Sequence, residues 1–213
     1  MHQQRARIGS SIELAGLLAA RARGASRLLV AIAGAPGSGK STVAEGLVAA
    51  LNAMEQGSAA QVPMDGYHYD NAVLVARGLL PRKGAPETFD AEGLAADLAR
   101  IRTGAEVAFP VFDRVADLAR ANAIVVSPDV RIVIVEGNYL LVDRPPWQAL
   151  ADCFDLTVMI ETARGELERR LIRRWLDHGM EETAAVARAR DNDLVNAAFV
   201  ARHSRPADFV FAN

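Results

Sequence analysis

Residues 34–41 read Gly-Ala-Pro-Gly-Ser-Gly-Lys-Ser and follow directly after an apolar run at residues 28–33. They match the pattern G-x-x-x-x-G-K-[ST] between a predicted strand and a predicted helix, which is typical of a phosphate-binding loop. Glycines let such a backbone curl around an anion, so that successive N–H groups point at phosphate oxygens. The positive end of the following helix dipole strengthens the attraction. The motif therefore predicts that the chain binds a nucleoside triphosphate.

Two side chains of this loop have chemistry suited to a nucleotide bound with magnesium. Lys40 is expected to reach the β- and γ-phosphates, and the hydroxyl of Ser41 is expected to ligate Mg²⁺. The alternative, a glycine-rich turn without a ligand, is disfavoured by the complete match in its strand–helix context. The residues predicted to bind the nucleotide are Gly34, Ala35, Pro36, Gly37, Ser38, Gly39, Lys40, Ser41 and Thr42.

Apolar runs and helical patterns alternate along the rest of the chain, which predicts an α/β fold of the P-loop NTPase type. We expect a mainly parallel, five-stranded sheet flanked by helices, with ligands bound at the carboxyl ends of the strands. The expected strands are residues 28–33, 61–64, 131–135, 156–160 and 209–211. A short extra strand pair, residues 107–112 with 124–126, is expected outside this sheet.

Length and composition narrow the class of protein further. A chain of 213 residues is enough for one domain over residues 1–213, beginning with a helix at residues 8–23 within an N-terminal segment, 1–25. A net charge of -2 gives no electrostatic reason to expect a nucleic-acid partner, and no apolar stretch is long enough to span a bilayer. The start of the chain lacks the apolar segment of an export signal, and with one cysteine, Cys153, an internal disulfide is excluded. We expect a cytoplasmic protein and leave a homodimer open.

Carboxylates follow two of the expected strands. Asp65 comes directly after the strand 61–64, so it is expected at the same sheet edge as the phosphate-binding loop. There it can accept the proton of an attacking hydroxyl or hold Mg²⁺ through water; an Asp that only caps a turn is the alternative. Glu136 ends the strand 131–135, as a Walker-B carboxylate does, which makes it a candidate Mg²⁺ ligand or a group that orients the nucleophile.

A basic helical segment follows the strand 156–160. Its arginines are Arg164, Arg169, Arg170, Arg173 and Arg174. Arg170 and Arg174 are one helical turn apart and share a face. Arginines that close over a nucleotide neutralise charge on the γ-phosphate and exclude water, so residues 164–180 are a candidate lid. A solvated, charged helix surface explains the same composition, and the sequence leaves both interpretations open.

Four further segments resemble the phosphoribulokinase/uridine kinase family. They are residues 64–68 (MDGYH), 82–90 (RKGAPETFD), 110–114 (PVFDR) and 133–138 (VIVEGN), which occur in the order and at about the spacing of that family. The resemblance runs from about residue 28 to the end of the chain. Within the family it is closest to bacterial fructose transport system kinases, with bacterial pantothenate kinase a near relative.

This resemblance implies a small-molecule kinase that transfers the γ-phosphoryl group of ATP, with Mg²⁺, to a primary hydroxyl. It favours a sugar such as fructose as the acceptor substrate, with a uridine-like nucleoside or pantothenate as alternatives. A switch protein that only hydrolyses a nucleotide is the competing interpretation. The polar segment 65–90 argues against a switch, because a switch needs no second small-molecule pocket. The preference for ATP over GTP is left open.

The resemblance also implies roles for individual residues. Asp65 stands at the position of the family's catalytic base, while Arg170 and Arg174 match its lid arginines; with Lys40 these are the expected catalytic residues. The family's acceptor pocket is formed by segments that here contain Tyr67, His68, Lys83, Asp113 and Arg114. Two positions depart from known members. Asp117 stands about where uridine kinases have a base-stacking histidine, and pantothenate kinase has a histidine in place of Arg114.

Overall fold

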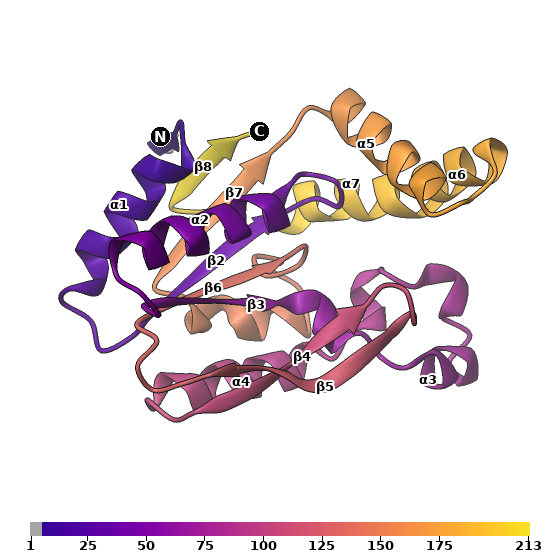
Figure 1. Ribbon diagram of the computed structural model, residues 1–213. Helices are drawn as coiled ribbons and strands as arrows, with labels where there is room; N and C mark the ends of the chain where they lie inside the picture. The colour runs from indigo at the N-terminus through magenta and orange to yellow at the C-terminus, as the bar shows by residue number, and fades with distance from the viewer. Residues whose placement is uncertain (1–5) are drawn as a thin grey trace.

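The computed structural model describes residues 6–213 (Figure 1). At its centre lie two strands that are buried along their whole length, β2 (Leu28–Gly34) and β6 (Ile132–Gly137). They pair in parallel, with Leu28 opposite Ile132 and Ala33 opposite Gly137. A strand covered on both faces has no solvated side to fill with polar residues, and the nearly continuous apolar sequence of β2 and β6 follows from this.

The complete sheet has the order β1-β8-β7-β2-β6-β3, and all of its strands are parallel. The remaining strands are β1 (Ala6–Ile8), β3 (Ala59–Pro63), β7 (Leu156–Glu161) and β8 (Phe209–Ala212). The predicted α/β fold, with a mainly parallel sheet and flanking helices, is confirmed. All five expected strands are present, and β1 adds a sixth to the predicted number.

The sixth strand changes the expected start of the first helix. Ile8 pairs with Phe211 of β8, and the helix α1 (Ser11–Ala22) begins only after it. The Ser10 hydroxyl accepts a hydrogen bond from the backbone N–H of Glu13 (3.2 Å), whose carboxylate accepts one from the N–H of Gly9 (3.1 Å). This capping box fixes the helix start three residues later than predicted. The part of the N-terminal prediction that concerns residues 1–5 lies outside the described residues.

Helices cover both faces of the sheet (Figure 1). On one face, α1 and α2 (Lys40–Met54) bury Leu18 and Leu47. On the other, α4 (Ala91–Arg102), the 3₁₀ helix η4 (Trp147–Cys153) and α7 (Leu194–His203) contribute to a second hydrophobic core. Among residues 6–213 no helix has both the length and the apolar character needed to cross a membrane.

A helical unit follows β7 and forms one side of the molecule (Figure 1). It consists of α5 (Arg164–Asp177), α6 (Glu182–Arg188), the π-helical turn η5 (Ala189–Asp193) and α7. The sequence predicts one uninterrupted helix over 183–203, and the structure places η5 in its middle. The unit has its own small core, against which Ala35 of the phosphate-binding loop packs. The loop and the helical unit are thereby held together.

The predicted strand pair outside the sheet is also present. It is the antiparallel ribbon of β4 (Val107–Asp113) and β5 (Leu118–Val126). Between β3 and α4 lie the 3₁₀ helices η1 (Met64–Tyr67), η2 (Leu80–Arg82) and η3 (Pro86–Thr88) and the short helix α3 (Asn71–Ala76). A Cβ at Gly66 would collide with the carbonyl of Pro110, so only glycine lets η1 approach β4 this closely. This contact places the tip of the ribbon beside the end of β3.

Candidate active site

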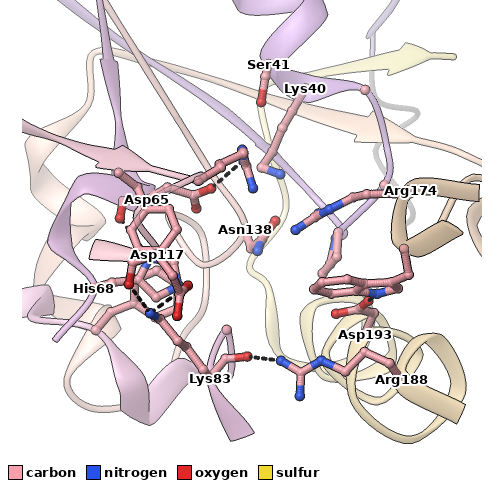
Figure 2. Close-up of a pocket in the computed structure, with 18 of the residues that line it drawn as sticks. Lys40, Ser41, Asp65, His68, Lys83, Asp117, Asn138, Arg174, Arg188 and Asp193 are labelled. Atoms are coloured by element: carbon pink, nitrogen blue, oxygen red, sulfur yellow. Dashed lines mark hydrogen bonds and ion pairs between the residues drawn. The ribbon is translucent and has the colours of Figure 1, made fainter. Parts of the chain in front are cut away.

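A cavity of about 320 Å³ lies among the phosphate-binding loop, η1, the tip of the β4–β5 ribbon and the helical unit α5–η5 (Figure 2). Figure 2 shows Lys40, Ser41 and Arg174 around one end of it, Lys83, Asp117 and Arg188 around the other, and Asn138 between them. The predicted site residues that line it are Pro36, Gly37, Gly39, Lys40, Ser41, Thr42, Asp65, His68, Lys83, Arg114 and Arg174. Four segments far apart in the sequence therefore meet at one cavity.

The phosphate-binding loop has the backbone that an anion cradle requires. Gly37 and Gly39 have φ angles of +78° and +85°, which L side chains rarely adopt. Gly39 is also the N-cap of α2, and the first turn of this 15-residue helix contains no acidic side chain that could satisfy or neutralise its N–H groups. Within the described residues the buried hydroxyl of Ser38 has no hydrogen-bond partner. These features fit a bound phosphate chain.

The two candidate magnesium ligands, Ser41 and Glu136, differ in their access to the cavity. Ser41 lines the cavity, whereas Glu136 lies in β6 with 5% of its surface exposed and does not. Burial raises the pKa of Glu136, and the nearby charge of Lys40 opposes this rise. Among residues 6–213 no group of three or more His, Cys, Asp or Glu side chains could hold a metal ion. The two oxygens fit Mg²⁺ only as part of a shell completed by phosphate oxygens and water.

Asp65 lies at the start of η1, and its side chain is 23% exposed. Its carboxylate accepts a hydrogen bond from Nη2 of Arg114 at 3.0 Å. Burial on its own raises the pKa of Asp65, but the neighbouring His68 and the charges of Lys40, Arg114 and Arg174 together lower it below the usual value. Asp65 is therefore an ionised carboxylate at neutral pH, and it faces the same cavity as Lys40.

His68 lies between two aromatic rings at the side of the cavity. Its ring centroid is 3.9 Å from that of Phe89 and 4.5 Å from that of Phe112. Burial lowers the pKa of His68 against the opposing charge of Asp65, so the ring is neutral at pH 7. The carbonyl of Asp65 lies 2.7 Å from Nδ1 and can only accept a hydrogen bond, so Nδ1 carries the proton. This leaves Nε2 as a hydrogen-bond acceptor.

Lys83 lines the cavity, but its ammonium already has several partners. Nζ donates to Oδ1 of Asn71 at 2.6 Å and to the carbonyl of Asp117 at 2.8 Å. It also forms an ion pair with Oδ1 of Asp117 at 2.9 Å. Asn71 donates in turn to the other carboxylate oxygen of Asp117 at 2.9 Å. The network fixes the tip of the β4–β5 ribbon to α3 and η2, so Lys83 is a structural clamp as well as part of the cavity wall.

Three of the predicted site residues point elsewhere. The hydroxyl of Tyr67 donates to Asp97 at 2.8 Å, on the far side of η1 from the cavity. Asp113 accepts hydrogen bonds from the backbone N–H groups of Val115 and Ala116 and thereby shapes the ribbon turn. Arg170 pairs with Glu166 at 2.6 Å and lies beside the phosphate-binding loop without lining the cavity. Gly34, Ala35 and Ser38 belong to the loop but also lie outside the cavity lining.

Several cavity residues were not predicted from the sequence. They are Gly84, Phe89, Phe112, Asp117, Asn138, Trp175, Arg188 and Asp193. Asn138 lies two residues after Glu136, and its position directly after a buried strand could have indicated it as a site residue. Asp193 lies in the π-helical turn, and the spacing of residues in the sequence does not predict such a turn.

Comparison with known proteins places these observations in a family. The model of the phosphoribulokinase/uridine kinase family matches residues 29–213. A solved "putative fructose transport system kinase" from Silicibacter sp. TM1040 is 48% identical, with a TM-score of 0.88 and coverage of 94% of this chain and 98% of that one. A "putative uridine kinase" of Schizosaccharomyces pombe is 34% identical, over 86% of this chain and 82% of its own. A pantothenate kinase of Myxococcus xanthus is 35% identical over 73% of this chain but only 51% of its own length.

Proposed function

Because the chain belongs to the phosphoribulokinase/uridine kinase family of P-loop kinases, we propose that it transfers the γ-phosphoryl group of ATP to a sugar such as fructose. That it is a phosphotransferase with a hydroxyl group of a small metabolite as acceptor follows from the family itself. To this the proposal adds ATP as the nucleotide, Mg²⁺ as the metal, a sugar as the acceptor, and roles for individual residues. We also propose that the protein is cytoplasmic, that it forms a single domain and that it has no nucleic-acid partner.

The observation that carries the proposal is that one cavity contains both an anion cradle and an ionised carboxylate. In this proposal Lys40 and Arg174 compensate the charge that spreads over the γ-phosphate during transfer. Ser41 and Glu136 would hold Mg²⁺ together with phosphate oxygens and water, and the ion would neutralise further phosphate charge. Asp65 accepts the proton of the attacking hydroxyl.

The ion pair between Arg114 and Asp65 has a consequence for this mechanism. The guanidinium covers one carboxylate oxygen of Asp65 at 3.0 Å. It keeps Asp65 ionised, but it also competes with the acceptor hydroxyl for that oxygen. Binding of the acceptor is therefore expected to move Arg114 aside, or to use the other carboxylate oxygen of Asp65.

The lid is part of the same proposal. Trp175 and Arg174 reach the cavity from the C-terminal half of α5. Residues 164–180 would close over the nucleotide and exclude water before transfer.

Two features favour a sugar over the alternative acceptors. The chain is 48% identical to the "putative fructose transport system kinase" over nearly the full length of both, whereas it spans about half of the pantothenate kinase. The position at which the family resemblance expects a base-stacking histidine is occupied by Asp117, which pairs with Lys83. A carboxylate does not stack on a nucleobase.

The test is turnover of ATP, followed by identification of the product, with fructose, uridine or pantothenate as the added acceptor. We expect one acceptor, a sugar, to stimulate turnover and to appear as its phosphate ester. The Lys40→Ala variant should abolish most of this transfer, because it removes positive charge from the β- and γ-phosphates. Hydrolysis that no acceptor stimulates but a protein partner does would instead support a nucleotide-dependent switch and overturn the proposal.

A further inference from the structure

We infer that Asn138 and Asp193 read the acceptor, and that this acceptor is an uncharged polyol rather than a carboxylate or a phosphate ester. The inference rests on the proposed kinase function and concerns only the end of the cavity away from the phosphate-binding loop. It assigns a binding role to two residues outside the predicted site, and it narrows the class of substrate.

Asn138 offers an unused hydrogen-bond acceptor in the wall of the cavity. It follows β6, lines the cavity and has only 8% of its surface exposed. Its Oδ1 is buried and has no hydrogen-bond partner among the described residues. A buried carbonyl oxygen without a partner destabilises the folded state, so such atoms in native proteins usually serve a ligand. Figure 2 shows Asn138 between the phosphate end and the opposite end of the cavity.

Asp193 offers a second acceptor across the cavity. It ends the π-helical turn η5, lines the cavity and is 7% exposed. One of its oxygens, Oδ2, accepts a hydrogen bond from Nε1 of Trp175 at 2.6 Å. Asp193 is buried while Asp191, two residues earlier, stays exposed, because residues two apart lie on nearly opposite sides of a helix. A buried carboxylate held by one neutral donor has capacity for further donors.

Both groups select for hydrogen-bond donors. An amide oxygen and an ionised carboxylate accept hydrogen bonds, and alcohol hydroxyls donate them. A polyol presents several hydroxyls in fixed relative positions, so one can meet Asn138 and another Asp193 while a third reaches Asp65. The charged group of a carboxylate or phosphate substrate has no proton to donate at neutral pH and would be repelled by Asp193.

The charges around the cavity are consistent with a neutral acceptor. Asp65 pairs with Arg114 at 3.0 Å and Asp117 with Lys83 at 2.9 Å. Burial raises the pKa of Asp193, and the charges of Arg174 and Arg188 oppose this rise. The cavity lining contains three carboxylates and five Lys or Arg cations, so two cations are in excess, and these can balance the phosphates.

Three of these cations, Arg188, Lys83 and Arg114, already have hydrogen-bond or ion-pair partners. Arg188 donates to the carbonyl of Pro81 at 2.8 Å and to that of Lys83 at 2.9 Å. Lys83 has the partners described above, and Arg114 is paired with Asp65. A substrate carboxylate or phosphate could gain a cation only by breaking one of these contacts. A neutral polyol gains nothing from such a cation and can use the other carboxylate oxygen of Asp65.

The first test compares pairs of acceptors that share a carbon skeleton and differ in charge: fructose with fructose 6-phosphate, and glycerol with glycerate. Wild-type enzyme and ATP are used throughout, and kcat/KM is measured for each acceptor. We expect the uncharged member of a pair to be preferred by tenfold or more. Equal use of both members, or preference for the anion, would overturn this inference and leave the kinase function standing. No transfer to any of the four would overturn both.

The second test assigns the selection to the two residues. Asp193→Asn and Asn138→Ala should each lower kcat/KM for the neutral acceptor by about 10- to 100-fold, the effect of a lost hydrogen bond to a buried group. The ratio of neutral to anionic use should also fall in Asp193→Asn, while the Kd for ATP stays within twofold of wild type. Asp191→Asn is the matched control, because it removes the same charge from an exposed position of the same turn.

A purely structural role for Asp193 gives a different pattern. It would lower use of neutral and anionic acceptors by the same factor, and this result would contradict the inference. Deoxy analogues of the accepted polyol provide a readout independent of stability. The deoxy analogue that lowers kcat/KM most in wild-type enzyme should lower it little further in Asp193→Asn or in Asn138→Ala, because the variant has already lost the same hydrogen bond. An equal further loss in both variants would show that neither residue reads a hydroxyl.

Discussion

The two lid arginines differ in the contacts that they already make. Arg170 is committed to Glu166 at 2.6 Å and lies beside the loop, whereas Arg174 lines the cavity and stacks at 5.1 Å from the centroid of the Trp175 ring. Burial, followed by the charge of Arg114, lowers the pKa of Arg174, which is the signature of a cation held near other cations. Binding of phosphates to Arg174 would relieve this repulsion.

We therefore predict unequal effects of removing these two side chains. Arg174→Ala should slow phosphoryl transfer by at least about 10²-fold, because it removes a cation from the developing charge. Arg170→Ala should slow transfer by less than about tenfold, since it deletes a partly exposed ion pair. Single-turnover kinetics at saturating ATP measures both. A larger loss from Arg170→Ala would mean that lid closure exchanges the two arginines.

In the proposed mechanism, the charge of Arg114 helps to set the pH above which Asp65 can act as a base. The folded-state pKa of Asp65 is depressed, so the carboxylate is available above that pKa and is lost as the pH falls through it. Arg114→Gln removes one of the groups that depress it, alongside His68, Lys40 and Arg174. The acid limb of the kcat/KM profile should then move to higher pH.

The matched control for this shift is Arg120→Gln, which removes a cation from the same ribbon. Arg120 pairs with Asp113 rather than with Asp65. The acid limb of the kcat/KM profile of Arg120→Gln should coincide with that of wild type. An unchanged limb in Arg114→Gln would exclude Asp65 as the titrating base.

The parts of the candidate site that could be predicted belong to short motifs, each contiguous in the sequence. The phosphate-binding loop is one motif whose backbone geometry follows from its glycines, so its residues could be named from the sequence. Asp193 and Arg188 reach the cavity because a helical unit packs back on the loop, and no local pattern records that contact. Tyr67 was expected in the acceptor pocket, but the 3₁₀ turn directs its hydroxyl to Asp97 instead.

At the scale of elements, the acceptor end of the cavity depends on how closely η1 and β4 approach. Gly66 makes this approach possible because it has no side chain. Gly66→Ala should force the ribbon away from the end of β3. We predict a loss of about 1–3 kcal/mol in the free energy of unfolding, the usual effect of overpacking. We also predict that KM for the acceptor rises more, relative to wild type, than KM for ATP does.

Gly46→Ala is the matched control at another glycine. Gly46 lies on the exposed side of α2, and a Cβ there meets nothing within 4 Å. Alanine is the better helix former, so this variant should gain about 0.5–1 kcal/mol of stability and keep both KM values. Denaturant titration and steady-state kinetics test the pair. A Gly66→Ala enzyme with normal stability and acceptor KM would show that the ribbon is not part of the pocket.

The elements themselves follow from the sequence to different degrees. Long apolar strands such as β2 and β6 are predicted well, because burial on both faces requires an unbroken apolar run. β1 has only three residues, and its pairing with β8 is a contact across most of the chain, so its pattern is too short to read. The start of α1 was readable in principle from the capping box of Ser10 and Glu13.

At the scale of the whole molecule, stability and chemistry are located at opposite ends of the sheet. Arg27 precedes the first residue of β2, is 6% exposed, and its guanidinium donates to five backbone carbonyls. These belong to Ile101, Ala105, Ser127, Pro128 and Val130. One side chain thus joins the end of α4 and the connection from β5 to β6.

Arg27→Lys should lower the free energy of unfolding by about 2–4 kcal/mol, since an ammonium cannot satisfy five carbonyls in a planar fork. The folded enzyme should keep its kcat, because the cavity lies at the carboxyl end of the strands. Arg23→Lys, at an exposed position on the same side of the molecule, is the control and should change stability by less than about 0.5 kcal/mol. Equal denaturation midpoints for the two variants would contradict this account of Arg27.

The account as a whole depends on a carboxylate and an anion cradle acting together in one cavity. The most direct measurement follows the γ-phosphoryl group of ATP into the acceptor in a single turnover, for wild type and for Asp65→Asn, with nucleotide affinity measured in parallel. We predict an unchanged Kd for ATP and transfer slower by roughly 10²–10⁴-fold in Asp65→Asn. Transfer at the wild-type rate in that variant would contradict the central claim.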